Sequence, residues 1–249
     1  MKKILELKNV SLTYQTPDDE ITAINGLTFD CKEGEFLSII GPSGCGKTTV
    51  LSIIAGLLKP TSGNITFNAG DKSLKSGLGY MLQKDQLFEW RTIEKNVFLP
   101  LEVKKVLTPE NKEYALSLLK KYGLYEFRKN YPSELSGGMR QRAALIRTLA
   151  AKPEILLLDE PFSALDYQTR LSVCDDVYKI IKAERKTAVL VTHDISEAIS
   201  MSDIIVVLTA RPAKVKSTYR LEFKSDTPTE RREEESFGKL FKEIWKELN

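Results

Sequence analysis

Nine consecutive residues in the first fifth of the chain have the composition of a phosphate-binding loop. They are Gly41-Pro42-Ser43-Gly44-Cys45-Gly46-Lys47-Thr48-Thr49, which satisfies G-x-x-x-x-G-K-[ST] and follows an apolar run. The glycines let backbone N–H groups surround phosphate oxygens, and the helix expected from Lys47 adds its unpaired donors. Lys47 is expected to reach the β- and γ-phosphates, and Thr48 to be a ligand of Mg²⁺. A purely structural glycine turn is the alternative, but such a turn does not need the Lys-Thr pair.

Two adjacent carboxylates follow a second apolar run, at Asp159-Glu160-Pro161. Ligands of an open parallel sheet bind at the carboxyl ends of its strands, so both acids are expected near the glycine loop. Asp159 is then suited to hold Mg²⁺, directly or through water, and Glu160 to orient and polarise an attacking water molecule. The alternative is that the pair caps the following helix.

The only histidine of the chain, His193, follows a third apolar run that ends at Thr192. Because this run is expected in the same sheet, the imidazole is placed to hydrogen-bond a γ-phosphate. The nucleotide is predicted to be ATP, because the nearest match to the guanine-reading pattern Asn-Lys-x-Asp lacks the aspartate, at 111–114. Tyr14 is a candidate for stacking on the adenine, with simple packing as its alternative.

A second anion-binding cradle is predicted at Ser136-Gly137-Gly138, where a serine and two glycines begin a helical pattern. Since the loop at 41–49 already holds the phosphates, a second cradle needs a different face of the same nucleotide. An ordinary N-terminal helix cap is the alternative.

Alternating strand and helix patterns are expected to position these residues in an α/β fold. Strands are predicted at Ile4–Val10, Leu27–Cys31, Phe36–Ile40 and Gly63–Phe67, and at the apolar runs 155–158 and 187–192. Helices are predicted at 139–151 and 169–184, and a helical insertion at about 89–150. Apolar residues from Phe237 to Leu248 recur at helical spacing and predict an amphipathic helix at about 230–249, docked on its own domain or, alternatively, on a partner or a membrane surface.

Composition narrows the class of protein. The 249 residues are 42% hydrophobic and 29% charged, which is enough to bury a core, and the formal charge of +3 does not suggest nucleic-acid binding by bulk electrostatics. The apolar runs are too short to span a bilayer, and Glu6 comes too early for a signal peptide. The three cysteines have neither metal nor disulfide spacing, which favours a reduced, cytosolic protein.

Up to about Leu208 the chain resembles the nucleotide-binding subunits of ABC transporters. The resemblance rests on Leu135-Ser136-Gly137-Gly138-Met139-Arg140-Gln141-Arg142 together with the motifs above and their order. In this family Tyr14 matches the A-loop aromatic, 41–48 the Walker A motif, Gln83 the Q-loop glutamine, 136–138 the signature, 155–160 the Walker B motif, 163–166 the D-loop and His193 the switch histidine.

The resemblance implies one ABC ATPase domain over 1–249, with a P-loop core, an N-terminal antiparallel β subdomain and an inserted helical subdomain. It implies catalytic roles for Lys47, Gln83, Glu160 and His193, a place for Gln83 in the Mg²⁺ site, and a place for Asp166 beside the nucleotide. It also implies a head-to-tail dimer in which ATP lies between the Walker A motif of one copy and the signature of the other.

Transport is implied in the same way. The subunit would work at the cytoplasmic side of the membrane with separate permease subunits, served by a solute-binding protein, and Gln83 and 85–98 would face the permease. The stretch 83–92 is similar to a pattern of importers for nitrate, sulfonates, taurine and pyrimidine precursors, with Phe88 and Glu89 at a usual leucine and proline.

Two other functions remain open, an exporter subunit and a soluble ABC ATPase of DNA repair, cluster assembly or translation. The interval from Lys47 to Glu134 is too short for the coiled-coil insertion of repair enzymes and lacks heptads, and translation-type members carry two cassettes in one chain.

Overall fold

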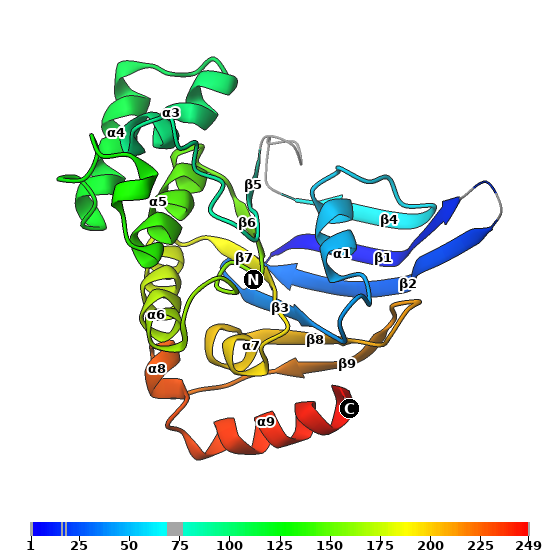
Figure 1. The fold of residues 1–249 in the computed structure, drawn as a ribbon. Helices are drawn as coiled ribbons and strands as arrows, with labels where there is room; N and C mark the ends of the chain where they lie inside the picture. Colours follow the sequence, from blue (N-terminus) through cyan, green and yellow to red (C-terminus); the bar gives the residue numbers. More distant parts are fainter. Residues whose placement is uncertain (1, 16, 18, 69–76, 249) are drawn as a thin grey trace.

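The computed structural model describes residues 2–15, 17, 19–68 and 77–248. A six-stranded sheet with the order β5-β6-β7-β3-β8-β9 lies beside a three-stranded antiparallel sheet with the order β2-β1-β4 (Figure 1). The larger sheet consists of β5 (Leu78–Met81), β6 (Ile155–Asp159), β7 (Thr187–Val191), β3 (Phe36–Ile40), β8 (Ile204–Leu208) and β9 (Val215–Arg220). The smaller one consists of β2 (Glu20–Lys32), β1 (Lys3–Gln15) and β4 (Ser62–Phe67). These sheets and the helices around them confirm the predicted α/β class.

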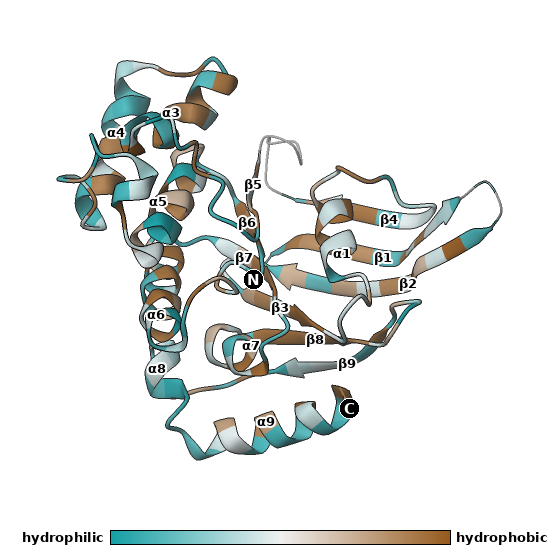
Figure 2. Cartoon of the chain, in the orientation of Figure 1, coloured by the Kyte–Doolittle hydropathy of each residue, from teal (hydrophilic) through white to brown (hydrophobic). Residues whose placement is uncertain are grey.

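The central strands explain where the chemistry is placed. Every residue of β3, β6, β7 and β8 is buried, as expected for parallel strands that are covered on both faces. Figure 2 shows these strands as the apolar centre of the molecule. Asp159 pairs with Val191, and Ile39 pairs with the same residue, so the chain leaves β6, β7 and β3 at one edge of the sheet.

The antiparallel strands are longer than the sequence predicted. β1 and β2 form a long hairpin in which Tyr14 pairs with Ile21, beyond the predicted ends at Val10 and Leu27. The register of the two strands shifts between Leu7 and Val10 and again up to Thr13. Such bulges break the alternation of inward and outward side chains, which hid these parts of the strands from a period-of-two reading.

Four helices of the described chain border the large sheet. They are α1 (Lys47–Ile54), α5 (Gly137–Ala150), α6 (Tyr167–Ala183) and α7 (Ile195–Met201). The interior on the α5 and α6 side of the sheet includes Leu158, Leu190 and Phe162, while Leu157 and Val191 pack toward the antiparallel sheet and α1. The sheet therefore separates two hydrophobic layers.

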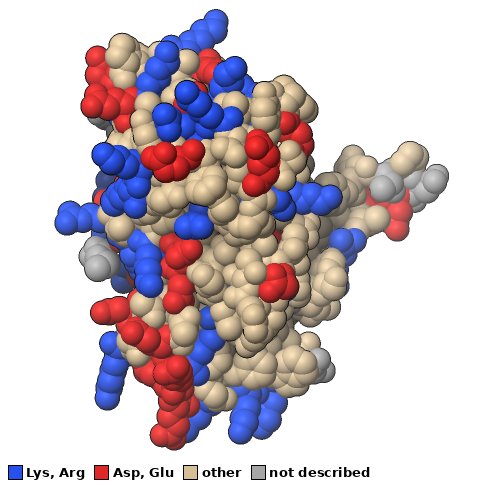
Figure 3. Space-filling model, turned by 60° about the vertical axis from the view of Figure 1, so that its left-hand side comes forward, with Lys and Arg blue, Asp and Glu red and all other residues tan. Residues whose placement is uncertain are grey.

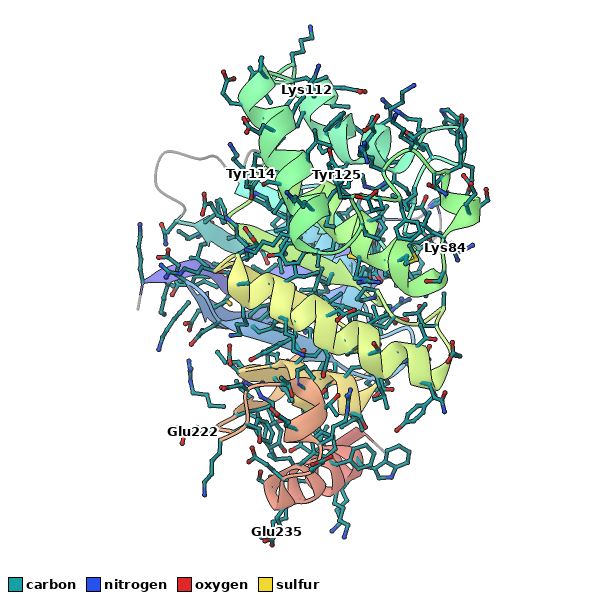
Figure 4. The ribbon with its side chains drawn as sticks, turned by 90° about the vertical axis from the view of Figure 1, so that its left-hand side faces the viewer. Lys84, Lys112, Tyr114, Tyr125, Glu222 and Glu235 are labelled. Carbon is teal, nitrogen blue, oxygen red and sulfur yellow. The ribbon has the colours of Figure 1, made fainter. Side chains whose placement is uncertain are left out.

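The helical insertion contains α3 (Ile93–Val103), α4 (Pro109–Lys121), a 3₁₀ turn at Pro132–Glu134 and the first part of α5. It stands at one end of the molecule, with Lys112 near its tip (Figure 4). Tyr114 and Tyr125 lie in this part, and each ring is covered by a cation, Lys152 at 4.7 Å and Arg128 at 4.1 Å from the ring centroid. Long basic side chains thus cover aromatic surface of the helical part.

The C-terminal region contains two helices where the sequence predicted one from about residue 230. α8 (Pro228–Arg231) ends before α9 (Glu235–Leu248) begins. The buried guanidinium of Arg231 donates to Ser200 O and Tyr178 Oη, and Glu234 accepts from Ser225 N. These contacts hold the charged run in a turn and prevent one continuous helix.

The long helix α9 is docked on its own chain. Ile244 is fully buried, in a cluster with Ile199 of α7 and Ile40 of β3. Phe241 packs against the same cluster and stacks on the exposed Trp245. Helix α9 lies at the bottom of Figure 1, at the end of the molecule opposite the helical insertion. No helix within the described residues combines the length and apolar character that a membrane span requires.

Surface charge is mixed. On the face that Figure 3 shows, lysine and arginine side chains alternate with aspartate and glutamate over the helical part and the lower part of the molecule. On this face the positive side chains are therefore mixed with negative ones and do not gather in one basic patch.

Candidate nucleotide-binding site

The glycine loop connects β3 to α1, as the sequence predicted. Gly44 and Gly46 have φ values of 71° and 115°, in the region that favours glycine. Gly41 is required for space, because a Cβ there would lie 2.9 Å from Cys45 Sγ and 3.1 Å from Leu208 Cβ. The loop is thus folded tightly against the end of β8, with Pro42 and Ser43 between these glycines.

Lys47 is buried under the loop that precedes it. Its Nζ donates to Gly41 O at 2.8 Å and to Pro42 O at 3.1 Å. Both acceptors are neutral carbonyls, and an ammonium group forms stronger bonds with anionic oxygens. The side chain is therefore positioned to exchange these carbonyls for phosphate.

Asp159 lies buried at the end of β6, between two hydroxyl groups. Thr48 Oγ1 and Tyr80 Oη each donate to this carboxylate, at 3.2 Å. Burial raises the pKa of Asp159, although both hydrogen bonds oppose the shift. Burial, and then the nearby Asp159 carboxylate, also raise the pKa of Tyr80 to about 12.

The donor set of Asp159 and Thr48 fits a hard cation. Carboxylate and hydroxyl oxygens are the ligands that Mg²⁺ takes from a protein when phosphates and water complete its shell. No cluster of three His, Cys, Asp or Glu side chains suited to a metal occurs in the part of the chain that the structure describes. A magnesium ion here would therefore depend on the nucleotide for some of its ligands.

Glu160 is the centre of a group of polar side chains beside Asp159. His193 Nδ1 lies 3.0 Å from Glu160 Oε2, and Gln83 Nε2 lies 3.4 Å from the same oxygen. The backbone of Glu160 has a φ of 44°, which costs a non-glycine residue energy and is held by its N–H bond to Val191 O. His193 keeps 59% of its side chain exposed.

Gln83 thus lies beside Glu160 and His193, which were predicted together with it as catalytic residues. Its amide also contacts Ser163 Oγ at 3.4 Å. The structure therefore brings the glutamine to the Glu160 carboxylate, and its predicted role as a ligand of Mg²⁺ stays a prediction.

The glycine loop, the start of α1, Glu160 and His193 meet at one cleft of about 540 Å³. The cleft is lined by Ser43, Gly44, Gly46, Lys47, Thr48, Thr49, Glu160, His193 and Arg211. Sequence reasoning placed eight of these at a nucleotide and missed Arg211, which belongs to no motif. It also missed Tyr80, because only the parallel pairing of β5 with β6 brings this tyrosine to Asp159.

Cys45 lies within the glycine loop but is buried. Burial raises the pKa of its thiol, and the positive charges of Lys47 and Arg211 oppose the rise. The reactivity of Cys45 was left open by the sequence, and the structure indicates an unreactive thiol.

The other predicted nucleotide contacts are not part of the lining of this cleft, namely Gly41, Pro42 and Cys45 of the glycine loop, and Tyr14, Ser136, Gly137, Gly138 and Asp166 outside it. Tyr14 is partly exposed near the end of β1. Ser136 caps α5 by accepting from Met139 N, and Asp166 caps α6 by accepting from Thr169 N, which lowers the pKa of Asp166. Both residues thus cap helices, and an ordinary helix cap was the alternative that the sequence left open for Ser136.

The two glycines after Ser136 are closely packed. A Cβ on Gly138 would lie 2.8 Å from Val173 Cγ2, and one on Gly137 would lie 3.0 Å from Leu165 Cδ2. The segment that begins α5 therefore lies directly against α6 and the segment that precedes it.

Comparison with known proteins places this arrangement among related chains. A family model described as ABC transporter matches residues 24–163. The uncharacterized ABC transporter ATP-binding protein YtlC of Bacillus subtilis is 50% identical over 248 residues, which cover 98% of this chain and 95% of that protein. The taurine import ATP-binding protein TauB of Roseobacter denitrificans is 38% identical over 221 residues, covering 88% and 82% of the two chains.

Solved structures agree with these relatives. The dimeric, post-hydrolysis structure of the ATP-binding cassette MJ0796 with ADP and Pi has a TM-score of 0.72 and 35% sequence identity. The match covers 88% of this chain and 99% of that one.

Proposed function

This chain belongs to the ABC transporter family and is one of its ATP-hydrolysing subunits, and from that premise we propose that it drives a membrane importer for a small solute. The cargo class is taurine or a related sulfonate, nitrate or a pyrimidine precursor. The observation that carries the catalytic part is that Lys47, Glu160 and His193 line one cleft beside the buried Asp159. The taurine-import relative supports the importer part.

Binding begins at the glycine loop. The backbone N–H groups of 44–48 surround the phosphates, and Lys47 exchanges Gly41 O and Pro42 O for β- and γ-phosphate oxygens. Thr48 and Asp159 would hold Mg²⁺, which neutralises phosphate charge as the terminal bond breaks. Tyr14 would stack on the adenine.

Hydrolysis depends on Glu160. Its carboxylate orients a water molecule and accepts a proton from it as the oxygen attacks the γ-phosphate. The His193 imidazole holds the carboxylate through Nδ1, and its exposed ring is free to turn its other nitrogen toward the phosphate. Gln83 supports the same carboxylate from the other side.

The complete site is proposed to need a second copy of the chain. Ser136, Gly137, Gly138 and Asp166 lie outside the lining of the cleft that contains Lys47, and Ser136 and Asp166 cap α5 and α6 within their own copy. In a head-to-tail dimer the 136–138 segment of one copy would cover the phosphates held by the other. The dimeric state of the similar MJ0796 cassette supports this arrangement.

Mixing two inactive variants tests this composite site. Lys47→Ala removes the phosphate cation and Ser136→Arg blocks the cradle, so each variant alone should hydrolyse ATP poorly. A mixed dimer contains one site with both defects and one intact site, so mixing should restore part of the phosphate release. If the mixture stays as inactive as either variant, both motifs act within one copy and the proposed dimer is wrong.

A pair of exposed aromatic residues is the proposed contact with the permease. Trp90 is 75% exposed and stacks on Phe88, with 4.8 Å between ring centroids. The buried amide of Asn96 bonds to Phe88 and Arg91, which holds this loop on α3. Rigid, exposed aromatic rings are typical of protein interfaces.

Two measurements test the importer. The chain is expressed together with the permease and the solute-binding protein that belong to it. It should then purify with the permease from the membrane fraction, bound at the cytoplasmic side. Trp90→Ala should reduce this association and leave ATP hydrolysis by the isolated subunit unchanged, whereas the matched variant Phe127→Ala should change neither association nor hydrolysis. Equal association of the two variants would remove the Phe88–Trp90 pair from the interface, and solute export would identify an exporter.

A further inference from the structure

Arg211 lies in the loop between β8 and β9 and lines the nucleotide cleft. β8 pairs in parallel with β3, with Val207 opposite Ile40, so the chain leaves β8 beside the glycine loop. The topology thus brings this guanidinium to Gly44, 167 positions earlier in the chain. No motif and no role assigned above involves this side chain.

The loop that carries Arg211 is held at its base. Thr209 N donates to Lys214 O at 2.9 Å, which closes the loop. Ala213 N donates to Ala23 O and Ala213 O accepts from Asn25 N, both at 2.9 Å, which fixes the loop to β2. Arg211 therefore extends from an ordered position toward the cleft.

The guanidinium has most of its donors to spare. Within the described ranges its one hydrogen bond runs from Nη2 to Gly44 O, at a long 3.3 Å. An arginine has five N–H donors, and its bonds to phosphate are much stronger than a long bond to a neutral carbonyl. The contact with Gly44 keeps the cation at the cleft and is easily exchanged.

The charge of Arg211 also acts within the glycine loop. Together with Lys47, it opposes the rise that burial causes in the pKa of Cys45. A polyanion in this cleft would therefore meet two side-chain cations, one from the loop itself and one from the strand that lies next to it.

We propose that Arg211 binds the phosphate chain of the nucleotide as a second side-chain cation, exchanging Gly44 O for phosphate oxygens. This inference rests on the proposed nucleotide site and adds a residue to it. The competing explanation is that Arg211 only braces the glycine loop through Gly44. The two differ in what they require, because phosphate binding needs the positive charge and bracing needs only an N–H donor.

Equilibrium titration with ATP, ADP and AMP at low ionic strength separates the two. Arg211→Ala should weaken ATP binding about tenfold, because a hydrogen bond between charged groups is lost. Arg211→Lys should keep part of the affinity, and Arg211→Gln, which can still donate to Gly44, should be as weak as the alanine variant. The loss should decrease from ATP to ADP to AMP, and added salt should reduce it.

Lys214→Ala is the matched control, since it removes an exposed cation from the same loop outside the cleft lining. It should bind ATP like the unchanged protein. Full affinity of Arg211→Gln, or equal losses for all three nucleotides, would overturn the proposal. Failure of the unchanged protein to bind ATP, or normal binding by Lys47→Ala, would instead refute the nucleotide site. If Arg211→Ala does not fold, the comparison of Arg211→Gln with Arg211→Lys still decides between the two explanations.

Discussion

Replacing Glu160 with glutamine should separate ATP binding from ATP hydrolysis. The glutamine has the shape of the glutamate but cannot accept a proton from water. General-base catalysis contributes about 10²–10⁴-fold, so kcat should fall by that factor, or roughly 3–5 kcal/mol of barrier. The Lys47 and Thr48 contacts with the nucleotide are unchanged, so the Kd for ATP should stay the same.

The fold should tolerate this substitution. The glutamine oxygen can still accept from His193 Nδ1, and the strained backbone of residue 160 keeps its bond to Val191 O. The free energy of unfolding should therefore change little, which removes misfolding as a cause of lost activity. Glu113→Gln, an exposed position on α4, makes the same chemical change away from the cleft and should keep full activity.

The assay is steady-state release of inorganic phosphate, paired with binding of a labelled ATP analogue and with solution scattering in saturating magnesium and ATP. The variant should bind the analogue normally, release phosphate very slowly and scatter as a dimer. Unchanged phosphate release would show that Glu160 only anchors His193. A particle of one copy, even with the permease present, would refute the proposed dimer.

Three other substitutions or modifications test the surroundings of the site. Burial raises the pKa of Glu197 to about 6. The free energy of unfolding should therefore fall by about 2 kcal/mol as the pH rises from about 4.5 to 6. Glu197→Gln should remove this loss, measured by urea unfolding at each pH. Parallel curves for the two proteins would contradict it. Ile244→Ala should lower the free energy of unfolding by about 2–5 kcal/mol, whereas a loss near zero would mean that α9 is not docked. Native Cys45 should react slowly with iodoacetamide and fast after unfolding, and rapid labelling of the native protein, mapped by mass spectrometry, would contradict its burial.

Most of the chemistry at the sheet edge could be predicted from local sequence. β3 has the predicted bounds, Phe36–Ile40, because a short apolar run followed by glycines has only one reasonable strand assignment. β6 and β7 each end one residue from the predicted bound, at Asp159 and Val191, where polar residues follow directly on apolar ones. Since parallel strands end at one edge, the positions of Lys47, Glu160 and His193 followed from strand ends alone.

The rest depends on contacts between distant segments. Arg211 and Tyr80 reach the site through strand pairing that no local pattern records. The break between α8 and α9 comes from the burial of Arg231 against Tyr178, although the local sequence suits a continuous helix. Tertiary contacts of this kind outweigh helix propensity, which is a weak preference of each residue.

Arg170 of α6 connects two parts of the site that the proposed mechanism uses at different nucleotides. Its Nη2 donates to Leu165 O at 3.0 Å, and its Nη1 bonds to Asp194 Oδ2 at 3.4 Å, next to His193. Leu165 in turn packs on Gly137. In the proposed dimer, His193 serves the nucleotide of its own copy, whereas Gly137 covers that of the partner copy.

In the proposed dimer, a change at one nucleotide would therefore reach the other through this short chain of contacts. If loss of the γ-phosphate releases His193, the turn at Asp194 is free to move, and Arg170 carries that movement to the Leu165 carbonyl. Because Gly137 has no space for displacement of Leu165 toward it, the segment that covers the partner's phosphates must move as well. In the proposed dimer, hydrolysis at one site would thus weaken the contact at the other, and the two copies would open together.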